Sequence, residues 1–128
     1  MGSEGYHEPL ELLSEHTRNL HRAIVSLIEE LEAVDWYQQR AGACSDPELK
    51  AVLLHHRNEE IEHAMMNLEW LIRHDATFAS NARTYLFTQG PITEIEESAT
   101  GKGDQDSKAG DGAGPATSLG IGSLKEGR

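Results

Sequence analysis

Residues 58–63 read Asn58-Glu59-Glu60-Ile61-Glu62-His63, and this stretch gives the clearest indication of fold and chemistry. Glu60 and His63 are three positions apart, so on a helix their side chains lie on one face. A Glu-x-x-His pair is what each of two helices contributes to the di-iron and di-manganese sites of carboxylate bundles. The stretch therefore predicts a metal-binding helix, and further ligands must come from elsewhere.

The composition restricts the possible partners. The 128 residues include 22 acidic and 11 basic side chains, which gives a formal net charge of −11. This charge disfavours nucleic acid, whose phosphates would be repelled, and favours cations. The single cysteine, Cys44, excludes an intrachain disulfide and indicates a reducing compartment. No apolar run approaches the ~20 residues of a membrane span, and no secretion signal is recognisable, so we expect a cytoplasmic protein.

The apolar spacing predicts an all-α fold. Residues 1–8 are expected to be flexible, and a first helix should run from residue 9 to about residue 40. Gly42, in the left-handed conformation, is expected to end it, and Ser45 or Asp46 should cap a second helix over residues 47–74. The short loop predicts an antiparallel hairpin. Residues 76–87 can form a short third helix.

The second helix carries apolar side chains on two sides. Glu60 and His63 lie on the first stripe, which contains Leu49, Val52, Leu53, Trp70 and Leu71. The second stripe contains Leu54, Ile61, Met65, Leu68 and Ile72. A helix that is apolar on two sides is buried on two sides, and one hairpin covers only one of them. Either the third helix folds back or a second copy of the chain covers the other side, and we favour association.

The first helix supplies a partner carboxylate. Glu30 lies about 60° from Leu27, at the edge of the apolar stripe, whereas Glu29 and Glu32 point to the far side. In an antiparallel hairpin Glu60 falls within about one turn of Glu30, at ~1.5 Å per residue. The three side chains Glu30, Glu60 and His63 can therefore converge into a buried, oxygen-rich set that suits iron or manganese. A full di-iron site needs two such sets, so we predict a site shared by two chains.

Structural roles remain open for several residues. A Glu-x-x-His pair also occurs on solvated helix faces, and Glu29 and Glu32 can be ordinary surface acids. Tyr37, seven positions after Glu30, is either close to the metal or part of the packing. Three further histidines are interpreted as structural or as supports for ligands: His21, His55 and His56.

The C-terminal part changes in composition. Residues 98–117 are rich in small and polar residues without periodicity, which predicts a disordered linker. The segment after it, residues 118–128, begins Ser118-Leu119-Gly120-Ile121-Gly122-Ser123-Leu124. Three branched aliphatic side chains at the end of a tether favour a docking peptide over a random apolar tail.

Taken together, these motifs resemble the encapsulated ferritins over about residues 7–97. The resemblance rests on Glu29-Glu30-Leu31-Glu32-Ala33-Val34-Asp35-Trp36-Tyr37, on residues 58–64 and on residues 83–92. The tail is similar to the targeting sequence that loads cargo into encapsulin shells. The resemblance implies a helical ferritin-like domain over residues 9–97, with two long helices and a short C-terminal one. It also implies a dimer that forms a ferritin-like four-helix bundle, and an open homodecameric ring of five dimers.

The resemblance further implies an activity and a site. The protein would be a ferroxidase that oxidises Fe²⁺ with O₂ at a di-iron centre and supplies iron for mineral storage. Glu30, Glu60 and His63 of two chains would form the centre, with Tyr37 close to the iron. Glu29 and Glu32, with Trp36 beside them, would receive incoming metal, with calcium or another divalent ion as an alternative occupant. The tail would bind the shell protein through Leu119, Ile121 and Leu124, so that the protein resides within an encapsulin nanocompartment.

Two other functions are compatible with the same residues. One is a non-catalytic metal-binding helical adaptor whose task is tethering. The other is a manganese or mixed-metal oxidase, because the donor set suits both metals.

Overall fold

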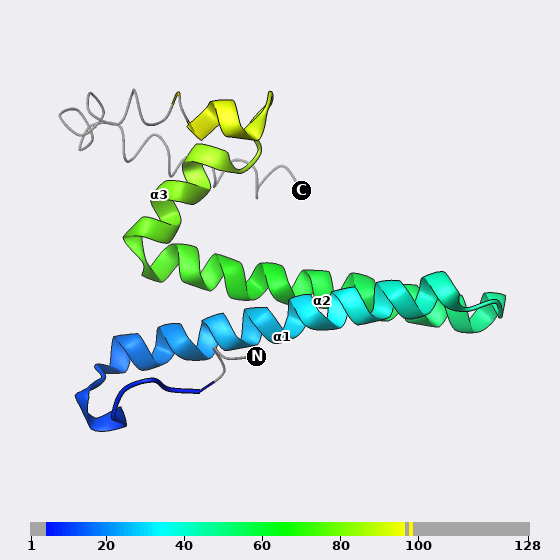
Figure 1. Ribbon diagram of the computed structural model, residues 1–128, viewed down its shortest axis with the longest axis horizontal. Helices are drawn as coiled ribbons and strands as arrows, with labels where there is room; N and C mark the ends of the chain where they lie inside the picture. Colours follow the sequence, from blue (N-terminus) through cyan, green and yellow to red (C-terminus); the bar gives the residue numbers. More distant parts are fainter. Residues whose placement is uncertain (1–4, 97, 99–128) are drawn as a thin grey trace. The chain divides into compact units, whose positions relative to one another are not determined.

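The computed structural model describes residues 5–96 and residue 98. The predicted linker, apart from residue 98, and the predicted docking peptide lie outside the described residues. Within them every element is helical: a short 3-10 helix η1 (Leu10–Leu12), two long helices α1 (Glu15–Ala43) and α2 (Pro47–His74), and a short helix α3 (Ala76–Tyr85) (Figure 1). The predicted all-α class, with two long helices followed by a short one, is confirmed.

The start of α1 differs from the prediction. Leu13 is extended, with φ −97° and ψ 130°, and separates η1 from α1. Ser14 caps α1, because its side-chain oxygen accepts a hydrogen bond of 3.0 Å from the Thr17 backbone N–H. A serine at this position satisfies a donor that the first turn would leave open. The predicted helix start at residue 9 is therefore wrong, and Pro9 precedes the 3-10 turn instead.

The connection between the long helices is also shorter than predicted. Gly42 lies inside α1, which continues to Ala43, so the expected left-handed end at Gly42 is wrong. Cys44 follows as the C-cap with φ −84°. The start of α2 is as predicted, since Asp46 accepts a 2.8 Å hydrogen bond from the Leu49 N–H and Pro47 occupies the first turn. The resulting loop is short enough that α1 and α2 pack antiparallel along their length (Figure 1).

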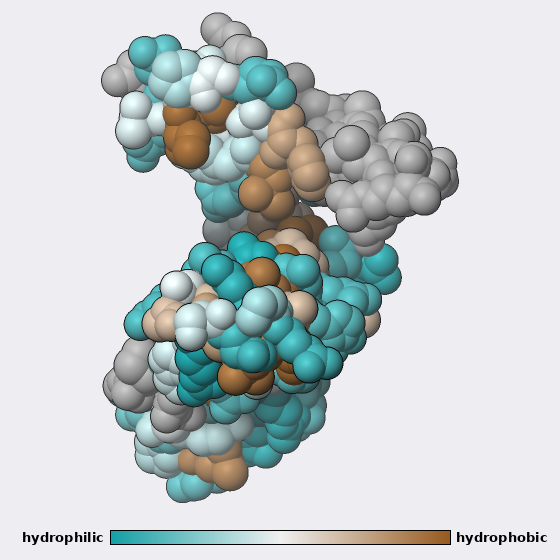
Figure 2. Space-filling view, turned by 90° about the vertical axis from the view of Figure 1, so that its right-hand side faces the viewer, coloured by the Kyte–Doolittle hydropathy of each residue, from teal (hydrophilic) through white to brown (hydrophobic). Residues whose placement is uncertain are grey.

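The hairpin has almost no enclosed core. Among the described residues only Ala41, Ala64 and Leu71 are buried. The first helix leaves Leu31 and Trp36 51% exposed, and the second leaves four large apolar side chains 45–62% exposed: Leu49, Val52, Met65 and Met66. Seen from the α1–α2 loop end, apolar patches interrupt the hydrophilic surface of the hairpin (Figure 2).

Both predicted apolar stripes of α2 keep exposed side chains. Leu71 of the first stripe is buried, and Ile61 and Leu68 of the second are half-buried, while Leu49 and Met65 stay exposed. Neither stripe is fully covered within one chain, so cover by the third helix or by a second copy stays a prediction.

Residues from 76 onward form a separate unit. In it, α3 ends at Tyr85, two positions before the predicted end, because Phe87 adopts a left-handed φ of 64°. Gly90, with φ 89°, and Pro91 then precede a helical turn over residues 92–96. Among the described residues, no helix combines the length and the apolar character that crossing a bilayer requires.

Candidate metal centre

Three side chains from the middle of the hairpin meet at its surface. Glu30 lies on α1, and Glu60 and His63 lie one turn apart on α2. One ligand atom from each falls within 4.8 Å of the others. In the described part of the chain this is the only group of three or more acidic, histidine or cysteine side chains that converges in this way. The predicted convergence across the hairpin is thus present in the structure.

Glu60 is at the centre of the group. Its Oε1 lies 3.1 Å from Nδ1 of His63, and the same imidazole nitrogen lies 3.8 Å from Oε1 of Glu30. The side chains of Glu30 and Glu60 are 26% and 24% exposed, and that of His63 is 47% exposed. Within one chain the set is only partly buried, because the hairpin covers the cluster from one side only, and its burial between two chains stays a prediction.

The two carboxyl groups shift each other's pKa in opposite directions. The hydrogen bond to Glu60 raises the pKa of Glu30, and desolvation adds to this rise. The same hydrogen bond lowers the pKa of Glu60, and the hydrogen bond with His63 acts in the same direction. The contact with Glu60 in turn raises the pKa of His63. Two carboxylates in one site repel each other, and the site holds too little water to screen that repulsion. Opposite pKa shifts are therefore expected.

This donor set fits a divalent transition metal. A cation between the three side chains would favour the ionised forms of Glu30 and Glu60 and would require a neutral His63 imidazole. Two carboxylates and one imidazole suit iron or manganese, whereas a structural zinc site normally has thiolate or histidine ligands. Three protein ligands on the surface of one hairpin leave the other coordination positions open to a second set of ligands or to substrate.

The two acids of α1 that were predicted to point outward differ in exposure. Glu29 is exposed and Glu32 is half-buried, and Trp36, which follows them on the outer side, is 51% exposed. These residues do not join the converging group of Glu30. Within one chain they form an acidic surface beside the cluster.

An aromatic layer lies next to the cluster, toward the loop, and the sequence did not indicate its pairing. The rings of Tyr37 from α1 and His56 from α2 are 5.3 Å apart, and the Arg40 guanidinium lies 5.3 Å from the centre of the Tyr37 ring. His55 instead contacts Glu59, with 3.2 Å between its Nε2 and a carboxylate oxygen. Tyr37 lies seven residues after Glu30, and His56 lies four residues before Glu60. In an antiparallel pair of helices both positions fall in one layer, and this spacing was the signal for their pairing that the sequence offered.

Comparison with known proteins identifies the family. The family described as EncFtn-like matches residues 5–89, which is more than half of the chain. The chain belongs to the EncFtn-like family. The encapsulated ferritin-like protein of Rhodospirillum rubrum is 60% identical over 129 residues, a match that covers 96% of this chain and 89% of that protein. The ferritin-like protein of Thermotoga maritima is 48% identical over 99 residues, covering 77% of this chain and 87% of that protein.

A solved structure agrees with the EncFtn-like fold. The crystal structure of protein ne0167 from Nitrosomonas europaea is similar with a TM-score of 0.67 and 59% sequence identity. The similarity covers 69% of this chain and 97% of that one. The resemblance to the encapsulated ferritins is therefore confirmed, and the chain is a ferritin-like, iron-related protein. The EncFtn-like match includes the whole converging group of Glu30, Glu60 and His63.

Proposed function

We propose that the protein is a ferroxidase that oxidises Fe²⁺ to Fe³⁺ with O₂ at a centre built by two subunits. The observation that carries the proposal is the convergence of Glu30, Glu60 and His63 within 4.8 Å on an open side of the hairpin. An oxygen-rich set stabilises the ferric state more than the ferrous one, because Fe³⁺ is the harder cation. The family membership supports iron as the metal.

A second copy of the chain would complete the site. A four-helix di-iron centre uses two single Glu residues and two Glu-x-x-His pairs, and one hairpin carries one of each. The exposed apolar side chains Leu49 and Val52 precede Glu60 and His63 by eleven residues each, which places them on the same face of α2 as the cluster. A two-fold contact there would bury apolar surface and bring two ligand sets together. The homodecameric ring remains part of this proposal.

The side chains of the cluster would bind and orient the metal ions. Glu30 and Glu60 would bind the substrate Fe²⁺ ions as carboxylates, and His63 would bind as the neutral imidazole. Two Fe²⁺ ions would each give up one electron, and O₂ would accept the pair. Tyr37, fixed between Arg40 and His56, would limit the space beside the ions.

The acidic surface outside the cluster would collect the substrate. Glu29 and Glu32 present two carboxylates next to Trp36, and the net charge of −11 raises the local concentration of cations. Calcium or another divalent ion would compete for the same pair. Metal would pass from this surface to the neighbouring Glu30.

The tail would deliver the enzyme to a shell. The Rhodospirillum rubrum relative is named as encapsulated, and its match covers 96% of this chain, so it reaches well into residues 97–128. We propose that residues 118–128 bind an encapsulin shell protein through Leu119, Ile121 and Leu124. The enzyme would then work inside a cytoplasmic nanocompartment, where the shell holds the mineral.

Anaerobic loading with Fe²⁺ followed by air tests the activity. Oxygen uptake in proportion to the iron added supports the ferroxidase, whereas metal binding without oxygen uptake would identify the adaptor. Metal analysis of the purified protein separates iron from manganese. Deletion of residues 118–128 should abolish capture by the shell protein and leave oxidation unchanged, and loss of oxidation in that deletion would contradict the tail assignment.

A further inference from the structure

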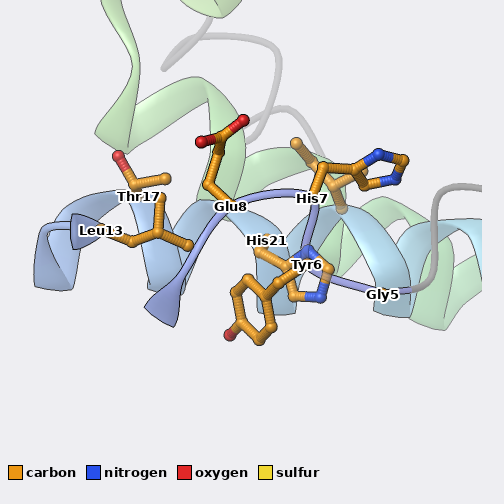
Figure 3. A pocket seen from close by; sticks show the side chains of 8 residues that line it. Gly5, Tyr6, His7, Glu8, Leu13, Thr17 and His21 are labelled. Carbon is orange, nitrogen blue, oxygen red and sulfur yellow. The ribbon is translucent and has the colours of Figure 1, made fainter. Parts of the chain in front are cut away.

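A pocket lies beside the first turns of α1, before the helix reaches the metal cluster. Residues 5–13, which we call the N-terminal arm, run along these turns (Figure 1) and leave a cavity of about 440 Å³. Side chains of the arm and of α1 line it: Tyr6, Glu8, Leu13, Thr17, His21 and Ile24, among others (Figure 3). Its volume falls in the range of ligand pockets, so side chains of a partner can enter it.

Two contacts between the arm and α1 hold the walls of the pocket. The Tyr6 ring stacks on the His21 ring at a centroid distance of 4.1 Å and an interplanar angle of 28° (Figure 3). Arg18 donates a 2.6 Å hydrogen bond to the Leu10 carbonyl oxygen. Because both contacts join the arm to the same helix, residues 5–24 form the pocket by themselves.

The arm exposes leucine side chains next to an apolar pocket. Leu12 is 73% exposed and Leu10 is 47% exposed, and neither lines the pocket of its own chain. Within the pocket, Leu13 and Ile24 are only half-buried, so apolar surface also faces the cavity. Exposed apolar side chains that gather at one place mark a surface for a partner, whereas single ones are ordinary.

We propose that the pocket receives Leu12 of a second copy of the chain, whose own pocket receives Leu12 of the first copy. The arm carries both the exposed leucine and one wall of the pocket, so a two-fold axis beside the arm brings each leucine to the other pocket. Such an isologous contact is self-complementary by construction. Removing apolar surface of both copies from water drives the association. We call this the arm contact.

The arm contact uses a different side of α1 from the metal cluster. Glu30 follows Ile24 by six residues and His21 by nine. At about 100° per residue, it lies about 120–180° around the helix from that wall of the pocket. A partner on the cluster side therefore leaves the pocket open. If the proposed dimer also forms, the two contacts can alternate from chain to chain and close a ring, and this consequence alone rests on the proposed function.

The acidic side chains of the arm oppose the arm contact and give it a recognisable salt dependence. Glu8 and Glu11 are both exposed, and a two-fold axis beside the arm brings like charges of the two copies together. Salt screens repulsion between exposed charges, over a Debye length of about 10 Å at 0.1 M and about 3 Å at 1 M. The arm contact should therefore strengthen as the salt concentration rises, whereas a contact held by ion pairs would weaken.

Sedimentation equilibrium of the full-length chain without metal tests the arm contact. The parent protein is Val52→Lys, which blocks the proposed contact at the cluster and leaves the arm unchanged. It should form dimers, more tightly at about 500 mM than at about 50 mM NaCl. Adding Leu12→Ser should weaken dimerisation at least about tenfold, because both copies lose a buried leucine. Adding Glu11→Ser is the matched control, since Glu11 is the exposed neighbour of Leu12, and it should leave the dimer as tight or tighter.

Two results would overturn the inference: a parent protein that stays monomeric up to about 1 mM chain, or equal dimerisation with Leu12 and with Ser at that position. Circular dichroism verifies that the variants keep their helices. Oxygen uptake with Fe²⁺ is measured separately on the wild type. A wild type that does not oxidise Fe²⁺ contradicts the proposed function and leaves the arm contact standing, whereas oxidation without dimers of the parent protein contradicts only the arm contact.

Discussion

Replacing Glu60 by glutamine is the sharpest test of the metal centre. Glu60 contacts both other members of the group: its Oε1 lies 3.1 Å from His63 Nδ1, and its carboxyl shares a hydrogen bond with Glu30. Glutamine keeps the size and helix preference of glutamate. It removes the negative charge and one of the two oxygens that can bind a metal. Because Glu60 is 24% exposed and outside the small core, Glu60→Gln should leave the helical structure intact.

The expected loss of Fe²⁺ binding and oxidation is large. Removing an outer hydrogen-bond partner of a metal ligand costs about 10–100-fold in metal affinity or activity. Glu60 is proposed as a ligand itself and also supports His63, so its replacement should weaken Fe²⁺ binding by ~100-fold or more. In a two-fold site the change occurs twice. At Fe²⁺ concentrations that saturate the wild type, the initial rate of oxidation should fall below about 1% of the wild-type rate.

The assay is the initial rate of oxygen consumption after Fe²⁺ is mixed with the aerobic protein, with circular dichroism to verify the helices. Glu59→Gln is the matched control, since Glu59 is the neighbouring residue and pairs with His55 on the exposed surface at 3.2 Å. That variant should stay within about twofold of the wild type, as expected for the loss of an exposed ion pair. Wild-type rates in folded Glu60→Gln, or equal losses in both variants, would refute the assignment of Glu60 as a ligand.

Three further predictions concern assembly, pH and the start of α1. Val52→Lys places a charge on the 45% exposed apolar side of α2, so Fe²⁺ should no longer raise the native mass that light scattering measures for the wild type; an unchanged increase would contradict the dimer contact. The contact with Glu60 raises the pKa of His63, and His63 must be deprotonated to bind a metal. Fe²⁺ affinity should therefore fall as the pH drops through that raised pKa, which occurs at a higher pH than for a free imidazole. Calorimetric titrations from about pH 8 to pH 5 measure this fall in affinity. Ser14→Ala removes the N-cap of α1 and should lower the free energy of unfolding in urea by about 1 kcal/mol.

The hairpin and the converging ligands were predictable because both depend on periodicity. Asp46 and Pro47 indicate a helix start through residue type alone, and the structure begins α2 at Pro47. The distances along the chain from the loop to Glu30 and to Glu60 determine the level at which they meet, and antiparallel packing brings them to 4.8 Å. Rise and rotation per residue are nearly constant in α-helices, so such predictions need no knowledge of side-chain packing.

Other features depend on competition between alternative local conformations, which periodicity does not describe. Pro9 and Ser14 are both acceptable near a helix start, and the extended conformation of Leu13 selects Ser14. Gly42 is free to adopt a left-handed conformation, yet α1 continues through it, because Cys44 and Asp46 already provide a C-cap and the next N-cap. The pairing of Tyr37 with His56 depends on the rotamers of two half-covered rings, which the sequence does not specify.

The exposure of the cluster leads us to expect that metal takes part in assembly. A single hairpin leaves Glu30 and Glu60 about one-quarter exposed, and the contact between them already raises the pKa of Glu30. Bringing a second set of the same residues against the first would add two more carboxyl groups to a site that has lost water, and like charges there repel strongly. Apolar contacts such as Val52 favour the approach, but the carboxylates oppose it until cations neutralise their charge. Binding of Fe²⁺ and dimerisation should therefore be thermodynamically linked, so each should strengthen the other.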